Sequence, residues 1–73
     1  MPLVKVSTQD RNGTELSSGY LPQGYESEEA AKAHIAELQK LYDLYGYDSR
    51  HARWWARQEH RSHITYWWLE YPS

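Results

Sequence analysis

The chain has 73 residues, with ten acidic side chains, eight basic ones and no cysteine. That length suffices for one domain over residues 1–73. The lack of cysteine excludes disulfides and thiolate metal ligands and favours a cytoplasmic location. No signal segment follows Met1 and no apolar run reaches about 18 residues, so the sequence predicts neither secretion nor a membrane partner.

Aromatic residues are the most unusual part of the composition. There are four tryptophans and seven tyrosines but no phenylalanine. Trp and Tyr combine a large apolar surface with a polar atom that needs a partner, which suits interfaces. All four tryptophans occur as adjacent pairs within residues 52–71. The net charge is −2, yet residues 49–73 carry four arginines against two glutamates, so the aromatic segment is the basic part of an acidic chain.

The first twenty residues predict a β-hairpin. Residues 3–8 alternate β-branched and polar side chains, and a weaker strand follows the turn up to Tyr20. Asn-Gly at residues 12–13 is a strong turn signal, because both residues tolerate positive φ. A type I turn with a glycine bulge would place Val4 opposite Tyr20, whereas a two-residue turn would place Lys5 there. We expect the first register, because it groups the apolar side chains.

The middle of the chain predicts one long helix. Ser27 is the expected N-cap, and two acidic residues follow it in the first turn, where the helix dipole favours negative charge. Gly46 is expected to end the helix as a left-handed residue just after Tyr45. Apolar residues recur at spacings of three and four between these ends, as one helical stripe. The stripe consists of Ala31, Ile35, Leu38, Tyr42 and Tyr45.

The last third predicts a second hairpin, with strands over residues 52–57 and 64–71 and a polar turn between them. Pro72 ends the final strand, because it has no amide hydrogen to donate. Two hairpins that flank one helix give the chain order ββαββ. The sequence therefore predicts an α+β fold, a four-stranded antiparallel sheet with one helix packed on one face.

Pairing Arg57 with Ile64 would give the second hairpin two different faces. Trp54 then lies opposite Trp67 in a set without charge, which should meet the helix. The opposite set is left open to solvent, and a slip of one residue in either strand would mix the two sets. The predicted open set is Arg53, Trp55, Arg57, Tyr66 and Trp68, with Glu70 beside them.

This open set predicts a small non-enzymatic protein-binding module, of adaptor or inhibitor type. Contiguous exposed apolar patches usually mark interaction sites, and Trp, Tyr and Arg dominate the binding energy at protein interfaces. The partner would be another protein or a second copy of the chain. A plainer interpretation competes closely, because cross-strand Trp, Tyr and Arg pairs also stabilise a sheet without any partner.

Two alternatives use the same charges and aromatics. Single-stranded nucleic acid could stack its bases on the aromatic face, but four arginines beside two acids neutralise few phosphates, so this alternative ranks lower. The second is a phage-type inhibitor that blocks a nucleic-acid-binding enzyme. Its acidic helix surface, Glu28, Glu29 and Glu37, would meet the basic surface of that enzyme. Both agree with an expected bacterial or phage origin.

Other chemistry has little support in the sequence. His51, His60 and His63 lie near one another, but a zinc site needs three or four ligands in fixed geometry, which a polar turn holds poorly. Such histidines could instead respond to pH near about 6. No nucleophile, phosphate loop or carboxylate pair indicates catalysis. We therefore expect no enzyme activity, no cofactor, no metal and no small-molecule substrate.

Overall fold

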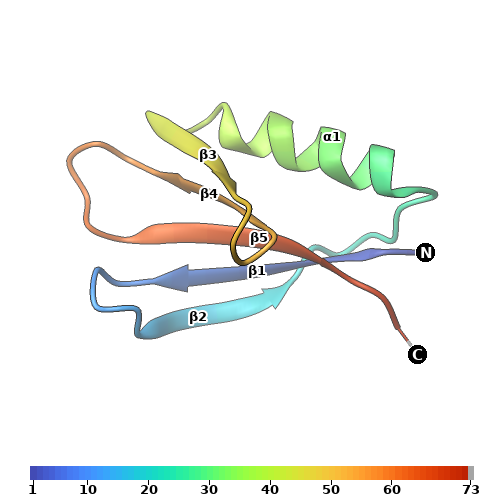
Figure 1. Cartoon of the computed structure of the whole chain (residues 1–73), viewed down its shortest axis with the longest axis horizontal. Helices are drawn as coiled ribbons and strands as arrows, with labels where there is room; N and C mark the ends of the chain where they lie inside the picture. Colours follow the sequence, from blue (N-terminus) through green and yellow to red (C-terminus); the bar gives the residue numbers. More distant parts are fainter. Residues whose placement is uncertain (73) are drawn as a thin grey trace.

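A computed structural model describes residues 1–72 as a five-stranded antiparallel sheet with one helix along one face (Figure 1). The strands lie in the order β2-β1-β5-β4-β3, so the first and last strands meet at the centre and β2 and β3 form the edges. The α+β class is confirmed, but the predicted four strands and ββαββ order are wrong. In chain order the elements are β1 (Leu3–Gln9), β2 (Glu15–Tyr20), α1 (Glu28–Gln39), β3 (Leu44–Asp48), β4 (Arg53–Arg57) and β5 (Ile64–Glu70).

The extra strand, β3, occupies Leu44 and Tyr45, which the sequence predicted as the end of the helix, and residues 46–48, which it predicted as a connector. Ser27 caps α1 as expected, because its Oγ accepts a hydrogen bond from Ala30 N at 3.2 Å. The helix nevertheless ends at Gln39, and Gly46 is not left-handed but lies inside β3. Leu-Tyr-Gly-Tyr alternates as a strand does, so it fits both periodicities. The strand forms instead, because pairing with β4 satisfies its backbone and brings the Tyr47 ring against Trp54 in a tilted contact, with ring centroids 4.9 Å apart.

A buried side chain ties the end of the helix to the new strand. Gln39 is only 6% exposed, and its Nε2 atom donates hydrogen bonds to Gly46 O and to Trp55 O, each at 3.0 Å. A buried amide needs such partners to offset its loss of water. Gln39 therefore fixes where α1 ends and how β3 and β4 lie beneath it.

The core lies between α1 and the face of β1, β5 and β4 that the helix covers. Val4, Ile35 and Ala56 are completely buried, and Trp67 is nearly so. Trp54 lies opposite Trp67 and packs against this core, as the sequence predicted. No helix of residues 1–72 is long and apolar enough to span a membrane.

The turn between β1 and β2 has the predicted form. Gly13 N donates a hydrogen bond to Asp10 O at 3.0 Å, and Gly13 has a φ of 85°. Asp10 Oδ1 also accepts hydrogen bonds from the backbone of Asn12 and Thr14. These bonds close a type I turn with a left-handed glycine after it.

The register beyond this turn differs from the prediction. Gln9 lies opposite Glu15, as a glycine bulge requires, but Leu16 is then an extra residue without a partner in β1. The remaining pairs shift by one, so that Lys5 lies opposite Tyr20. The predicted pairing of Val4 with Tyr20 is therefore wrong. The sequence does not indicate this second bulge, because β2 consists mostly of exposed residues and the bulge only changes which of them lies opposite each residue of β1.

Candidate functional site

The face of the sheet opposite α1 carries all five predicted contact residues. Trp55 pairs with Tyr66, and both alternate with residues that face the helix, so they point the other way. Arg53, Arg57 and Trp68 follow by the same alternation. None of the five is fully exposed; each is half-buried, because the side chains cover one another. We call this surface, formed by the outward residues of all five strands, the open face.

The pairing of β1 with β5 adds residues that sequence reasoning missed. Lys5 lies opposite both Trp68 and Tyr20, so it belongs to the open face. Its Nζ atom lies 4.5 Å from the centroid of the Tyr20 ring. No local signal could have found these residues, because they depend on which strands are neighbours.

Glu70 joins the two aromatic residues at this end of the open face. It accepts hydrogen bonds from Tyr20 OH at 2.6 Å and from Trp68 Nε1 at 2.9 Å. These bonds stabilise the carboxylate, so they hold the pKa of Glu70 below its ordinary value of 4.5, with the bond from Tyr20 the larger cause. The same bond raises the pKa of Tyr20 above 10.0, since the phenolate could not donate it.

Arg53 is held in place on β4, between a side chain of β5 and one of β3. Its guanidinium carbon lies 3.7 Å from the centroid of the Tyr66 ring, and its Nε atom lies 3.4 Å from Asp48 Oδ2. His51 Nδ1 lies 2.8 Å from the same carboxylate oxygen. That contact is the main cause of the lowered pKa of Asp48. Arg53 is therefore a fixed part of the surface rather than a mobile cation.

A shallow groove on the open face runs from Asp48 along β4 and β5. It has a volume of about 480 Å³ and is lined by Asp48, Trp55, Arg57, Ile64 and Tyr66. The Trp55 indole lies directly over Gly46, where a Cβ atom would lie 3.0 Å from the indole Nε1 atom. The groove thus combines an aromatic wall, an acid at one end and an arginine at the other.

The acidic residues of the second predicted surface lie elsewhere. Glu28, Glu29 and Glu37 are exposed on α1, on the opposite side of the molecule from the open face (Figure 1). Glu37 also forms an exposed ion pair with Lys40 at 3.6 Å. The helix and the open face therefore cannot contact one small ligand together.

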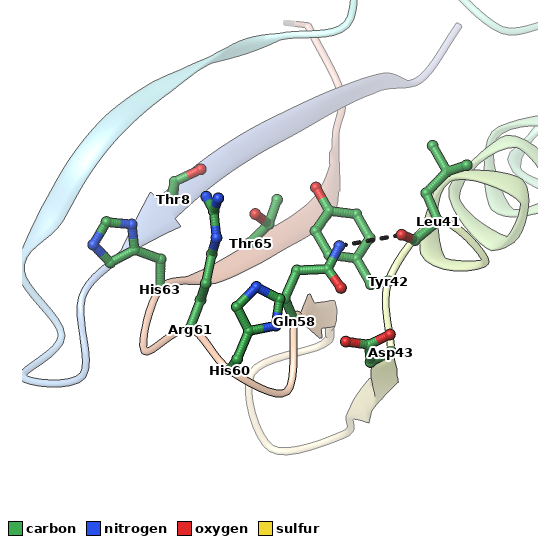
Figure 2. Close-up of a pocket in the computed structure, with 9 residues that line it drawn as sticks. All are labelled: Thr8, Leu41, Tyr42, Asp43, Gln58, His60, Arg61, His63 and Thr65. Atoms are coloured by element: carbon green, nitrogen blue, oxygen red, sulfur yellow. Dashed lines mark hydrogen bonds between the residues drawn. The ribbon is translucent and has the colours of Figure 1, made fainter.

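A larger cavity of about 700 Å³ lies on the helix side, between the loop after α1 and the β4–β5 loop (Figure 2). Gln58 Nε2 donates a hydrogen bond to Leu41 O at 3.2 Å across it. Arg61 extends between His60 and His63 toward the strands, as Figure 2 shows. Polar side chains of these loops line the cavity, together with Thr8 of β1 and Thr65 of β5.

The three histidines of the basic segment do not converge. His60 and His63 line this cavity, whereas His51 contacts Asp48 in the β3–β4 turn. Within residues 1–72 no group of three or more His, Cys, Asp or Glu side chains could hold a metal ion. The residue types that could bind a metal are thus spread over two ends of the sheet.

Comparison of the chain with protein-family models, with curated proteins and with solved structures finds no match.

Proposed function

We propose that the chain is a non-enzymatic protein-binding module whose contact surface is the open face. One observation carries the proposal: no element of residues 1–72 covers this face, although it carries four aromatic side chains among three cations. Uncovered aromatic and arginine-rich surface of this kind is typical of interface centres. The residues are Tyr20, Trp55, Tyr66 and Trp68, with Lys5, Arg53 and Arg57.

The groove beside Trp55 is the best anchor for a partner. Tyr66 forms the second aromatic wall, and the contact with Arg53 fixes it. Side chains that are already ordered lose little conformational freedom on binding, so more of the contact energy appears as affinity. We therefore expect the partner to insert an apolar or aromatic side chain here and to meet Arg57 with an acidic group.

The charge balance favours a protein over nucleic acid. Asp48 and Glu70 lie on the same face as the cations, and Arg53 already contacts Asp48. Affinity for a polyanion grows with the number of phosphates neutralised, and here the acids offset part of the positive charge. Aromatic residues surrounded by charges of both signs fit a protein interface, which has an apolar centre and a polar rim.

A random peptide library displayed on phage tests the proposal. We expect selection on the wild-type protein to enrich peptides with an aromatic or large apolar residue near an acidic one. Trp55→Ala should weaken binding of those peptides by about tenfold or more, because truncation of a hot-spot residue costs about 2 kcal/mol or more and about 1.4 kcal/mol is tenfold in affinity. Arg57→Glu, tested separately, should weaken binding by at least as much, because it places an acid opposite the acidic group of the peptide. Arg11→Glu is the matched control, since it makes the same charge change at an exposed turn position.

Three results would contradict the proposal. The first is that no peptide is enriched, and the second is that the wild type and both open-face variants bind the peptides equally. The third is that Arg11→Glu weakens peptide binding as much as the open-face variants do. A labelled thymine oligonucleotide distinguishes the alternative, because nucleic-acid affinity falls steeply as salt rises whereas an aromatic protein contact changes little. Near-ultraviolet circular dichroism confirms that each variant is folded.

A further inference from the structure

The edge strand β3 carries exposed apolar surface outside the open face. Tyr45 and Tyr47 are 52% and 51% exposed on the helix side of β3, and Leu41 is exposed in the loop that precedes the strand. No charged residue occurs from Leu44 to Tyr47. An edge strand with unpaired backbone groups and no charge readily accepts another strand.

The other edge of the sheet, β2, is protected. The bulge at Leu16 interrupts its regular spacing, and the charged Glu15 comes just before it. Bulges and charges are the usual means by which edge strands avoid pairing. Of the two edges, β3 is therefore the one suited to accept a strand.

Gln39 reveals which backbone groups of β3 are free. Its Nε2 atom bonds to both Gly46 O and Trp55 O, so these two carbonyls lie between β3 and β4 and the two residues form a hydrogen-bonded pair. Along an antiparallel ladder, hydrogen-bonded pairs alternate with pairs whose backbone N–H and C=O groups point away from the partner strand. The N–H and C=O groups of Tyr45 and Tyr47 therefore point to the free edge.

We propose that β3 pairs antiparallel with β3 of a second copy of this chain, about a two-fold axis at Gly46. Tyr45 of each copy then lies opposite Tyr47 of the other, and their free N–H and C=O groups bond to one another. Both tyrosines lie on the helix side of the sheet, so two cross-strand aromatic pairs form. This inference rests on β3 alone and not on the function of the open face.

The charges around β3 favour a second copy over a foreign strand. Asp43 precedes the strand and Arg50 follows it, while Asp48 at the end of the strand is already in contact with Arg53 of its own chain. Two-fold antiparallel pairing brings the acidic end of one copy to the basic end of the other. Asp48 lies opposite Leu44, so no two acids meet. The strand is therefore complementary to itself in its free hydrogen-bonding groups and in the placement of Asp43 and Arg50.

Two double variants that differ only in the sign of one charge test the register. Tyr45→Lys with Tyr47→Lys places cations opposite each other at both pairs, whereas Tyr45→Lys with Tyr47→Glu places a cation opposite an anion. Sedimentation is measured at low salt from micromolar to millimolar protein. We expect a wild-type dimer, a dissociation constant raised roughly 100-fold in the Lys/Lys variant, and a dimer restored in the Lys/Glu variant.

Amide hydrogen exchange supplies a test without any variant. The Tyr45 and Tyr47 amides should become protected as the wild-type concentration rises, while the inward Gly46 amide stays protected throughout. A wild type that is monomeric at millimolar concentration, or two double variants with equal mass, would overturn the proposal. The proposal would also be overturned if Trp55→Ala abolished the dimer while the Lys/Lys variant remained a dimer. Peptide binding by the folded Lys/Lys monomer tests the open face separately, because that variant changes β3 alone.

Discussion

Gly46 shapes one wall of the groove on the open face by having no side chain. A Cβ atom there would lie 3.0 Å from Trp55 Nε1 and 3.1 Å from Cζ2, closer than such atoms normally approach. The indole can therefore rest on the backbone of β3 and form the wall of the groove. Sequence reasoning assigned this glycine a different role, at the end of a helix.

We expect Gly46→Ala to push the indole outward and to lower the free energy of unfolding by about 1–3 kcal/mol, as overpacking usually does. Urea denaturation measures the loss, and tryptophan fluorescence reports the indole. Gly19→Ala is the matched control, because a Cβ there meets no atom within 4 Å and needs no unusual φ. Equal effects of the two substitutions would contradict the close packing at Gly46.

At the scale of elements, Glu70 connects a central strand to an edge strand. It lies on β5 and bonds to Tyr20 on β2, across the intervening β1. The charged carboxylate of Glu70 accepts this bond more strongly than the neutral carboxyl group does, so protonation of Glu70 weakens the bond. Because the folded-state pKa of Glu70 is lowered, its contribution to stability is present above about pH 4.5 and is lost as the pH falls through the folded-state pKa. Tyr20 has a raised pKa, so its contribution is lost as the pH rises above 10.0.

We expect Tyr20→Phe to raise the pKa of Glu70 toward 4.5 without reaching it, because the bond from Trp68 remains. The variant should also lose less stability than wild type on acidification. Carbon NMR of the Glu70 carboxyl through a pH titration measures the pKa directly. An unchanged pKa would show that Tyr20 does not bond to Glu70 in solution.

The second hairpin was predictable because its two tryptophan pairs leave only one uncharged face. The pairings of Trp54 with Trp67 and of Trp55 with Tyr66 are confirmed. β3 was not predictable, because Leu-Tyr-Gly-Tyr fits both the helical stripe that precedes it and the two-residue period of a strand. Lys5 and Tyr20 lie on the open face because the first and last strands pair. Local sequence patterns do not indicate which distant strands pair. Gln39 was missed because a polar residue next to the apolar stripe usually faces water.

At the scale of the whole molecule, the core is small and stability is limited. Domains of this length are stabilised by roughly 4–11 kcal/mol, at about 0.05–0.15 kcal/mol per residue. Few side chains are completely buried, and Ile35 is the largest of them. A single change there therefore removes a large share of the total.

We expect Ile35→Ala to lower the free energy of unfolding by about 2–5 kcal/mol and Ile35→Val by about 0.5–1.5 kcal/mol. Urea denaturation of both variants checks the two values, with circular dichroism to show that each is folded before denaturant is added. A loss in Ile35→Ala no larger than that in Ile35→Val would mean that α1 does not pack on the sheet as described.

The central pairing of β1 with β5 has a consequence for how the chain folds. The two strands are the first and the last of the six elements, so the middle of the sheet cannot close until β5 has been synthesised. Until then the β1–β2 hairpin keeps one side of β1 unpaired, with Val4 and Val6 exposed to other nascent chains. Bringing β1 and β5 together closes a loop of most of the chain, and this costs conformational entropy before the contacts between the two strands form. Refolding should therefore take milliseconds to seconds rather than the microseconds of helical bundles.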